Sequence, residues 1–311
     1  MPNQDIFVIG ASSGGVEALE KLVSQLPPGF PGSLFVVLHL LPRTRSYLPE
    51  VLTKAGRLPA MHPENGQRIE QGCIYVAPAD RHLVIERDHI HLSWGPREQH
   101  HRPCINVTFR SVALAHGERV AGIVLTGELD DGTAGLWEVK RRGGIAIVQN
   151  PEEAAFPSMP LSALREVEAD YVVGLAGMGQ LLTRLTSEYG EHKRTEIEAA
   201  KVEPRLTDLT CPDCRGTIWE ISRGNGKEYR CRVGHTFSPK AMFSEHFAAQ
   251  EKALYGAIVA LEEGTSLASQ LADQFDSPVS ERLRAEARER ELQAETITKI
   301  LTERSSFSLD S

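Results

Sequence analysis

A glycine-rich turn near the N-terminus carries the first side chain whose type and position could do chemistry. Ser12 lies in the sequence GASSGG at residues 10–15, between an apolar run that predicts a strand and a segment with apolar residues at helical spacing. Such a turn exposes a side chain and directs backbone N–H groups outward at a helix N-terminus. The serine could be a nucleophile, or the turn could bind a phosphate. The turn lacks the G-x-G-x-x-G spacing of dinucleotide sites, which weakens the phosphate interpretation.

Two further polar positions follow predicted strands and could activate that serine. His39 is near the end of the apolar run at residues 34–40, and Asp130 and Asp131 follow the run at residues 120–125. A serine hydroxyl needs a base, imidazole is the usual base near neutral pH, and a buried carboxylate can orient the imidazole. The structural alternatives are a histidine that only stabilises the fold and aspartates that cap the next helix. Spacing alone does not choose between the two aspartates.

Strands that alternate with helices would bring these positions to one place. Between residues 5 and 186, short apolar runs alternate with helical segments. This alternation predicts an α/β fold with a doubly wound, mostly parallel sheet and helices on both faces. Sites in such sheets form at the carboxyl ends of the strands, which is where the serine, the histidine and the aspartates are expected.

The order of these motifs resembles the catalytic domain of the chemotaxis protein-glutamate methylesterases, the CheB type, over about residues 5–186. The matching segments are GASSGG at 10–15, VVLHLLP at 36–42, YVAP at 75–78, RPCINVTFRSVA at 102–113, LTGELDDG at 125–132 and SMP at 158–160. The resemblance implies a triad in which Ser12 is the nucleophile, His39 the base and Asp131 the carboxylate. It also implies hydrolysis of glutamate methyl esters on a chemoreceptor or related signalling protein, glutamine deamidation as a second activity, and no cofactor for catalysis.

Two departures from the family pattern qualify this expectation. Glu128 and Leu129 stand where the family has Met-Gly. Backbone N–H groups near Ser13 and Glu128 are the candidate oxyanion donors, and a carboxylate there would be unfavourable unless it points to solvent. The receiver domain that usually precedes the family's catalytic domain is not expected here. The alternative hypothesis is therefore a non-catalytic signalling or scaffold protein with a methylesterase-like fold.

A cysteine-containing segment follows the predicted α/β region. Cys211 and Cys214 form a C-x₂-C pair, and after sixteen residues Cys231 and His235 form C-x₃-H. This spacing is typical of a zinc ribbon and predicts one structural zinc bound by three thiolates and an imidazole. The alternatives are buried free thiols beside an unrelated histidine, or a redox C-x-x-C. A unit of about thirty residues has little core of its own, which favours the metal.

The domain organisation follows from these segments and from a charged stretch between them. We predict a catalytic domain at residues 1–189, a linker at 190–206, a zinc-ribbon-like unit at 207–238 and a helical hairpin at 239–311. The many charges of the hairpin suit either a solvated face or a surface that docks a protein partner, a second copy or the catalytic domain itself.

Composition limits the partners and the compartment. The chain has 311 residues, 41% hydrophobic and 24% charged, with a net charge of −8, which argues against broad nucleic-acid binding. We find no membrane-spanning run and no secretory signal, so we expect a cytoplasmic protein without membrane insertion or disulfides. Arg102, with His100 and His101 before it, could contact an acidic substrate segment or simply begin a helix.

Overall fold

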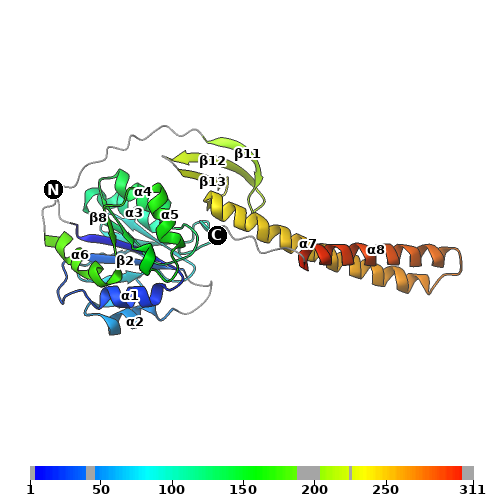
Figure 1. The fold of residues 1–311 in the computed structure, drawn as a ribbon, viewed down its shortest axis with the longest axis horizontal. Coiled ribbons are helices and arrows are strands. Elements are labelled where there is room, and N and C mark those ends of the chain that lie inside the picture. Colours follow the sequence, from blue (N-terminus) through cyan, green and yellow to red (C-terminus); the bar gives the residue numbers. More distant parts are fainter. Residues whose placement is uncertain (1–3, 40–45, 188–203, 224–225, 303–311) are drawn as a thin grey trace. The chain divides into compact units, whose positions relative to one another are not determined.

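The chain forms two compact units, Met1–Ala241 and Met242–Ser311, whose elements are labelled in Figure 1. The computed structural model describes residues 4–39, 46–187, 204–223 and 226–302. The predicted linker at 190–206 lies mostly outside the described residues, and the predicted domain boundaries remain predictions.

A seven-stranded sheet is the centre of the first unit. Its strands are β1 (Ile6–Ala11), β2 (Ser33–Leu38), β3 (Ala60–Met61), β5 (Ile74–Val76), β8 (Val120–Val124), β9 (Ile145–Gln149) and β10 (Tyr171–Val173). Their order is β10-β9-β8-β1-β2-β5-β3, and all pairings are parallel. Every residue of β1, β2 and β8 is buried, because helices cover both faces of a parallel sheet. The predicted doubly wound, mostly parallel sheet is confirmed.

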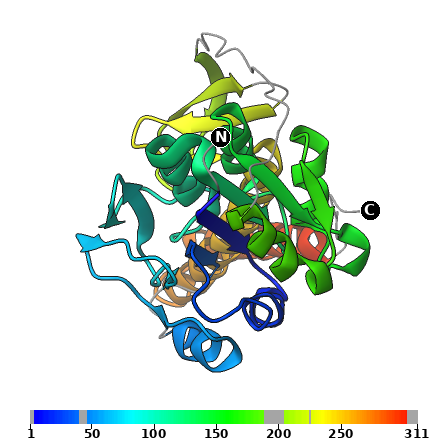
Figure 2. The same cartoon turned by 90° about the vertical axis from the view of Figure 1, so that its left-hand side faces the viewer.

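The helices form one layer on each face of this sheet (Figures 1 and 2). One layer holds α1 (Gly15–Val23), α2 (Leu48–Ala55) and α6 (Leu175–Ser187), and the other holds α3 (Ile105–His116), α4 (Thr133–Arg141) and α5 (Ser158–Glu166). Short 3-10 turns occur at Gly117–Arg119 and Pro151–Glu153. Alternate residues of β1 enter opposite layers: Phe7 and Ile9 pack on the α1 side, whereas Ile6 and Val8 pack on the α3 side.

Two small antiparallel sheets accompany the main one. The first contains β4 (Gln67–Arg68), β6 (His82–Glu86) and β7 (His89–Ser93). The second contains β11 (Arg205–Thr210), β12 (Thr217–Arg223), β13 (Gly226–Cys231) and β14 (Thr236–Phe237). The second sheet carries the cysteine-containing segment, and its strands β12 and β13 pair antiparallel.

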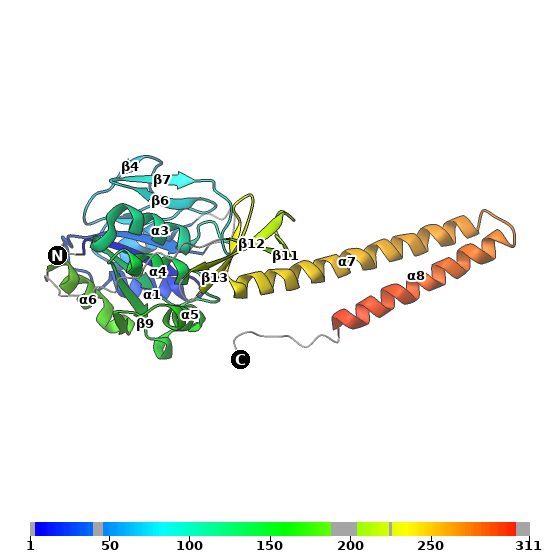
Figure 3. The ribbon, with the colours of Figure 1, turned by 90° about the horizontal axis from the view of Figure 1, so that it is seen from above.

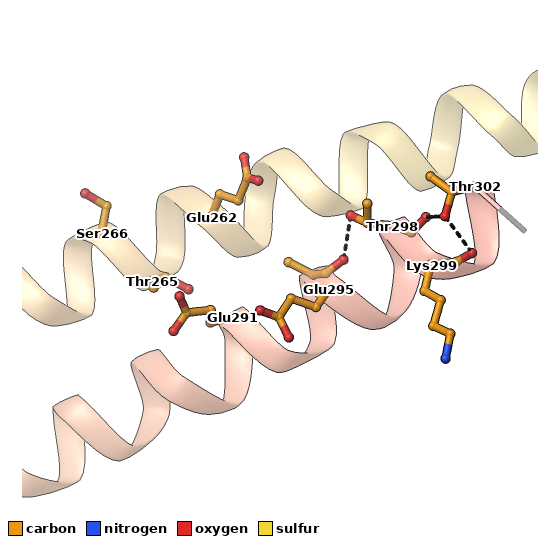
Figure 4. Close-up of a pocket in the computed structure, with 9 residues that line it drawn as sticks. Glu262, Thr265, Ser266, Glu291, Glu295, Thr298, Lys299 and Thr302 are labelled. Atoms are coloured by element: carbon orange, nitrogen blue, oxygen red, sulfur yellow. Dashed lines mark hydrogen bonds between the residues drawn. The ribbon is translucent and has the colours of Figure 1, made fainter.

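A long helical hairpin forms the C-terminal part of the described chain (Figure 3). It consists of α7 (Pro239–Ala272) and α8 (Val279–Thr302), which confirms the predicted hairpin. Small side chains line the contact between the helices, and the Thr265 hydroxyl donates to the Ala287 carbonyl at 3.4 Å. A groove between them is lined mainly by carboxylates and hydroxyls, such as Glu262, Glu291 and Thr298 (Figure 4). None of the described helices is both long and apolar enough to cross a membrane.

Candidate active site

The residues that directly follow β1, β2 and β8 lie beside one another. β1 pairs with β2 on one side and with β8 on the other, so the carboxyl ends of the three strands lie at the point where the sheet reverses its winding. Backbone bonds fix the loops together: the Ser12 N–H donates to the Thr126 carbonyl at 3.0 Å, and the His39 N–H to the Ala11 carbonyl at 3.3 Å. The predicted site residues therefore reach one place because of the strand order.

Ser12, His39 and Asp131 form a continuous series of side-chain contacts. The Ser12 Oγ lies 3.0 Å from His39 Nδ1, and His39 Nε2 lies 2.8 Å from Asp131 Oδ2. In the tautomer that carries its hydrogen on Nε2, the Nε2–H donates a hydrogen bond to the carboxylate and Nδ1 presents a lone pair to the serine hydroxyl. The side chains of His39 and Asp131 are 8% and 2% exposed, so water does not compete for this contact. The arrangement can move a proton from a serine to an imidazole.

The Asp131 carboxylate lies at the N-terminus of α3. It accepts hydrogen bonds from the backbone N–H groups of Ile105 at 2.8 Å and Asn106 at 3.0 Å, and from the Cys104 thiol at 3.2 Å. Burial opposes ionisation, but the hydrogen bond and charge interaction with His39 and the hydrogen bond from the Ile105 N–H outweigh it and hold the pKa of Asp131 well below its ordinary value. A helix N-terminus stabilises negative charge in the same way. Sequence reasoning missed Cys104, although it lies within the RPCINVTFRSVA match.

Asp130 has the opposite environment. Its side chain is partly buried, hydrogen-bonds to Ser238 rather than to the histidine, and leaves a buried Oδ1 without a partner among the described residues. Burial raises the pKa of Asp130 to about 6, and the charge of Asp131 adds to this shift. The structure thus brings Asp131, and not Asp130, to His39.

Two glycines allow the close approach of the loops around Ser12. Gly14 precedes α1 with φ +72°, a conformation that favours glycine. A Cβ on Gly127 would lie 2.8 Å from the Ser12 Cβ and would also clash with the Met159 sulfur. Any larger residue at position 127 would displace the serine.

The candidate oxyanion donors lie in the same two loops. No acceptor among the described residues takes the backbone N–H of Ser13 or of Glu128. The Ser12 carbonyl, which shares its peptide with the Ser13 N–H, accepts from the Gly15 N–H at 2.8 Å and fixes that peptide. Glu128 is exposed, so its carboxylate has access to solvent as the sequence argument required.

The residues before α3 cover the imidazole. The ring of His101 stacks on that of His39 with centroids 3.4 Å apart and planes 8° apart. Burial and the nearby His39 lower the pKa of His101 to about 3, so this ring is neutral. Arg102 donates to the Asp80 carboxylate and to the carbonyls of Trp94 and Gly95. These internal bonds favour the structural interpretation of Arg102 over substrate contact.

Comparison with known proteins identifies the family. The profile described as CheB methylesterase matches residues 7–182. The chain belongs to the CheB methylesterase family. A crystal structure of the Thermotoga maritima CheB methylesterase catalytic domain matches with a TM-score of 0.57 and 30% identity, over 60% of this chain and 99% of that one. The predicted family and fold are confirmed.

Two relatives show how much of the chain the CheB methylesterase match covers. The protein-glutamate methylesterase/protein-glutamine glutaminase 2 of Methanosarcina acetivorans is 37% identical over 190 residues, which is 58% of this chain and 53% of that protein. The putative protein-glutamate methylesterase/protein-glutamine glutaminase of Leptospira interrogans is 34% identical over 184 residues, 59% of this chain and 95% of that protein. The chain thus spans about half the length of the first relative.

Outside the CheB methylesterase match, the four predicted metal ligands come together. One ligand atom from each of Cys211, Cys214, Cys231 and His235 lies within 4.8 Å of the other three. The Cys214 and Cys231 sulfurs are 3.7 Å apart, and His235 Nδ1 is 3.5 Å from the Cys231 sulfur. Zn–S bonds of about 2.3 Å in a tetrahedron place two sulfurs roughly 3.8 Å apart. The cluster could therefore hold a metal ion.

Proposed function

We propose that this CheB-family chain is a serine esterase that removes methyl esters from glutamate side chains of chemoreceptors or related signalling proteins. The observation that carries the proposal is the contact series from Ser12 Oγ through His39 to Asp131, at 3.0 and 2.8 Å. Nucleophile, base and orienting carboxylate act in this arrangement on several unrelated folds. The names of the Methanosarcina and Leptospira relatives state the same activity, which supports the substrate class.

In the first half of the reaction, Ser12 Oγ attacks the ester carbonyl while its proton passes to His39 Nδ1. Asp131 stays ionised, keeps Nε2–H in place and stabilises the imidazolium that forms. The backbone N–H groups of Ser13 and Glu128 stabilise the negative tetrahedral oxygen, and one such donor contributes about 3–4 kcal/mol in related hydrolases. The proton on Nδ1 then goes to the departing methoxide, which leaves as methanol.

In the second half, water attacks the acyl-enzyme and loses its proton to His39. The serine leaves with that proton, and a free glutamate is released. A glutamine substrate would form the same acyl-enzyme with ammonia as the leaving group, which agrees with the second activity in the names of the relatives. No step requires a cofactor.

The experiment that tests the proposal measures methanol released from methylated receptor membranes. We expect Ser12→Ala to abolish release, while Ser13→Ala, which keeps the backbone donor, retains most of it. Release by Ser12→Ala at the wild-type rate would overturn the assignment.

The second candidate is a scaffold protein that keeps the fold without the chemistry, which the Glu128-Leu129 departure favours. The solvent access of Glu128 supports the enzyme instead. A serine-directed fluorophosphonate separates the two, because only an activated serine reacts quickly. Failure of the folded protein to label at Ser12 would favour the scaffold.

We further propose that the four-ligand cluster binds one structural zinc. Three thiolates and an imidazole would fill a tetrahedral site and leave no open position for catalysis. His235 Nε2 lies 3.9 Å from an Asp213 carboxylate oxygen, which suits the outer carboxylate that commonly orients a ligating histidine. A cytoplasmic location and a docking role of the hairpin remain predictions.

A further inference from the structure

A five-residue segment just after His235 contacts the loops that frame the triad. We call this segment, residues 236–240, the clasp. The Gln99 N–H donates to the Thr236 carbonyl at 2.7 Å, and the Ser238 N–H donates to Gln99 Oε1 at 3.0 Å. The Ser238 side chain also hydrogen-bonds to the Asp130 carboxyl. One short stretch therefore links the loop before α3 to the loop that carries Asp131.

The clasp also contacts the start of α5, where Lys240 Nζ lies 3.0 Å from Ser158 Oγ. Ser158 Oγ donates in turn to the Leu129 carbonyl at 3.1 Å. A second connection runs through α3: Arg110 pairs with Glu98 and lies 3.8 Å from Glu228 on β13. The four-stranded sheet and the clasp thus contact the loop before α3, the loop that carries Asp131, and the start of α5.

Gln99 is the centre of these ties. It is 4% exposed, and it adopts a φ of +51°, next to His100 at +65°. Two consecutive left-handed residues other than glycine are strained and persist only when the surroundings hold them. The backbone pair between Glu98 and His101 closes the loop, with the His101 N–H donating at 2.9 Å. The hydrogen bonds of Gln99 with Thr236 and Ser238 stabilise this loop conformation from outside the loop.

The loop in this conformation lays His101 on the catalytic imidazole. The two rings are 3.4 Å apart between centroids and nearly parallel. A neutral ring on one face prevents His39 from turning about its side-chain bonds. Such a turn would lengthen the contact to Ser12, and small displacements of a catalytic group reduce rates strongly.

We propose that Gln99 is a positioning residue of the esterase. Its side chain, fixed by the clasp, keeps the His101 ring stacked on the His39 ring. The four-stranded sheet that carries the four candidate ligands thereby contributes to the geometry of the active site. The proposal rests on the proposed function for the role of His39, but it concerns residues that lie outside the triad. The rival interpretation is a purely structural bond that affects stability alone.

The test compares two substitutions of Gln99 with a matched control in the full-length, metal-replete protein. Gln99→Met keeps the volume but removes the acceptor for Ser238, whereas Gln99→Glu keeps an acceptor. The control is Gln25→Met, because Gln25 Oε1 also accepts from a backbone N–H, that of Gly179, at the far end of α1. Unfolding temperatures of all variants measure the structural effect separately.

We expect Gln99→Met to lower kcat about 10–100-fold with KM within about 2-fold, and Gln99→Glu to be closer to wild type. Gln25→Met also removes the bonds that the Gln25 amide donates to the Lys21 and Leu175 carbonyls, so it should lose at least as much stability and yet keep wild-type kcat. The rate of Ser12 labelling by a fluorophosphonate should fall with kcat. Wild-type kcat and labelling rate in Gln99→Met would overturn the inference.

A double-mutant cycle with His101→Leu tests the route of the effect. If Gln99 acts through His101, the second substitution adds little to the first; full additivity would contradict the inference. The labelling rate also keeps the two proposals apart. A wild-type protein that labels but releases no methanol contradicts the proposed substrate and leaves this test intact.

Discussion

Asp130 and Asp131 are neighbours in the chain, yet their carboxyls differ in every respect that matters for catalysis. Asp131 receives backbone donors from α3 and stays ionised, whereas Asp130 is partly buried without them and has a pKa raised to about 6. The sequence places both after β8 but does not reveal which one meets the histidine. The deciding N–H groups, of Ile105 and Asn106, come from a helix about 25 residues earlier in the chain.

This difference predicts that the same substitution has a large effect on activity at one aspartate and a small effect at the other. Asp131→Asn should lower kcat by about 10³–10⁴-fold, because the amide favours the wrong imidazole tautomer. Asp130→Asn should stay within a few-fold of wild type. Methanol release from methylated receptor measures both. Equal losses in the two variants would contradict the assignment of Asp131 as the orienting carboxylate.

The raised pKa of Asp130 also predicts a pH-dependent stability. The folded state holds this proton up to a pH of about 6, whereas the ordinary value is 3.8. Between these pH values the folded state binds more protons than the unfolded state, so this group lowers the free energy of unfolding as pH rises. Asp130→Asn should therefore stabilise the protein above pH 6, by at most about 3 kcal/mol, and make little difference near pH 3.8. Denaturant unfolding across this range measures it; a constant difference would contradict the prediction.

At the level of elements, the parallel sheet and the place of the candidate site could both be predicted from the sequence. Apolar runs such as β2 and β8 are buried throughout, so they predict strands without further information. Parallel strands align their carboxyl ends, and this puts Ser12, His39 and the aspartates together. Ring stacking by His101 depends on the strained conformation of the loop at residues 98–101, for which the sequence has no local signal.

The β1–α1 turn allows a test with a matched glycine. Gly14 and Gly29 both have φ +72°, but a Cβ on Gly14 would lie 3.1 Å from the Ala155 Cβ, whereas one on Gly29 meets nothing within 4 Å. Alanine at either position should cost about 1–2 kcal/mol of backbone strain. Only Gly14→Ala should also reduce kcat, because the turn carries Ser12. Unchanged kcat in folded Gly14→Ala would contradict a rigid role for this turn.

At the level of the whole chain, the cysteine spacing predicts the four ligands but not what their sheet contacts. C-x₂-C and C-x₃-H bring their side chains together through local turns, which spacing can reveal. The bond from Ser238 to Gln99 joins residues 139 positions apart and depends on how two separately formed sheets meet. No sequence periodicity predicts such a contact, so the link between the four candidate ligands and the contact series of Ser12, His39 and Asp131 is visible only in the structure.

The four-stranded sheet has a small apolar core of its own. Within residues 204–223 and 226–237, the fully buried apolar side chains other than cysteine are those of Ile218 and Phe237. Units of this size usually need a metal or disulfides, and structural zinc contributes about 10–16 kcal/mol in small peptides. We therefore predict about one zinc per chain after metal-replete expression, lost in Cys231→Ser and kept in Cys73→Ser. Elemental analysis that finds no zinc in the wild type would contradict the prediction.

Removal of that zinc should unfold the small sheet first and leave the parallel sheet intact. A strong chelator should raise amide hydrogen exchange over residues 205–223 and 226–237, while β1 and β8 remain protected. If the clasp holds Gln99 as inferred, exchange at residues 98–101 should rise as well, and Ser12 labelling should slow in the same samples. Exchange that rises at residues 205–223 and 226–237 with an unchanged labelling rate would show that the sheet binds its metal for stability alone.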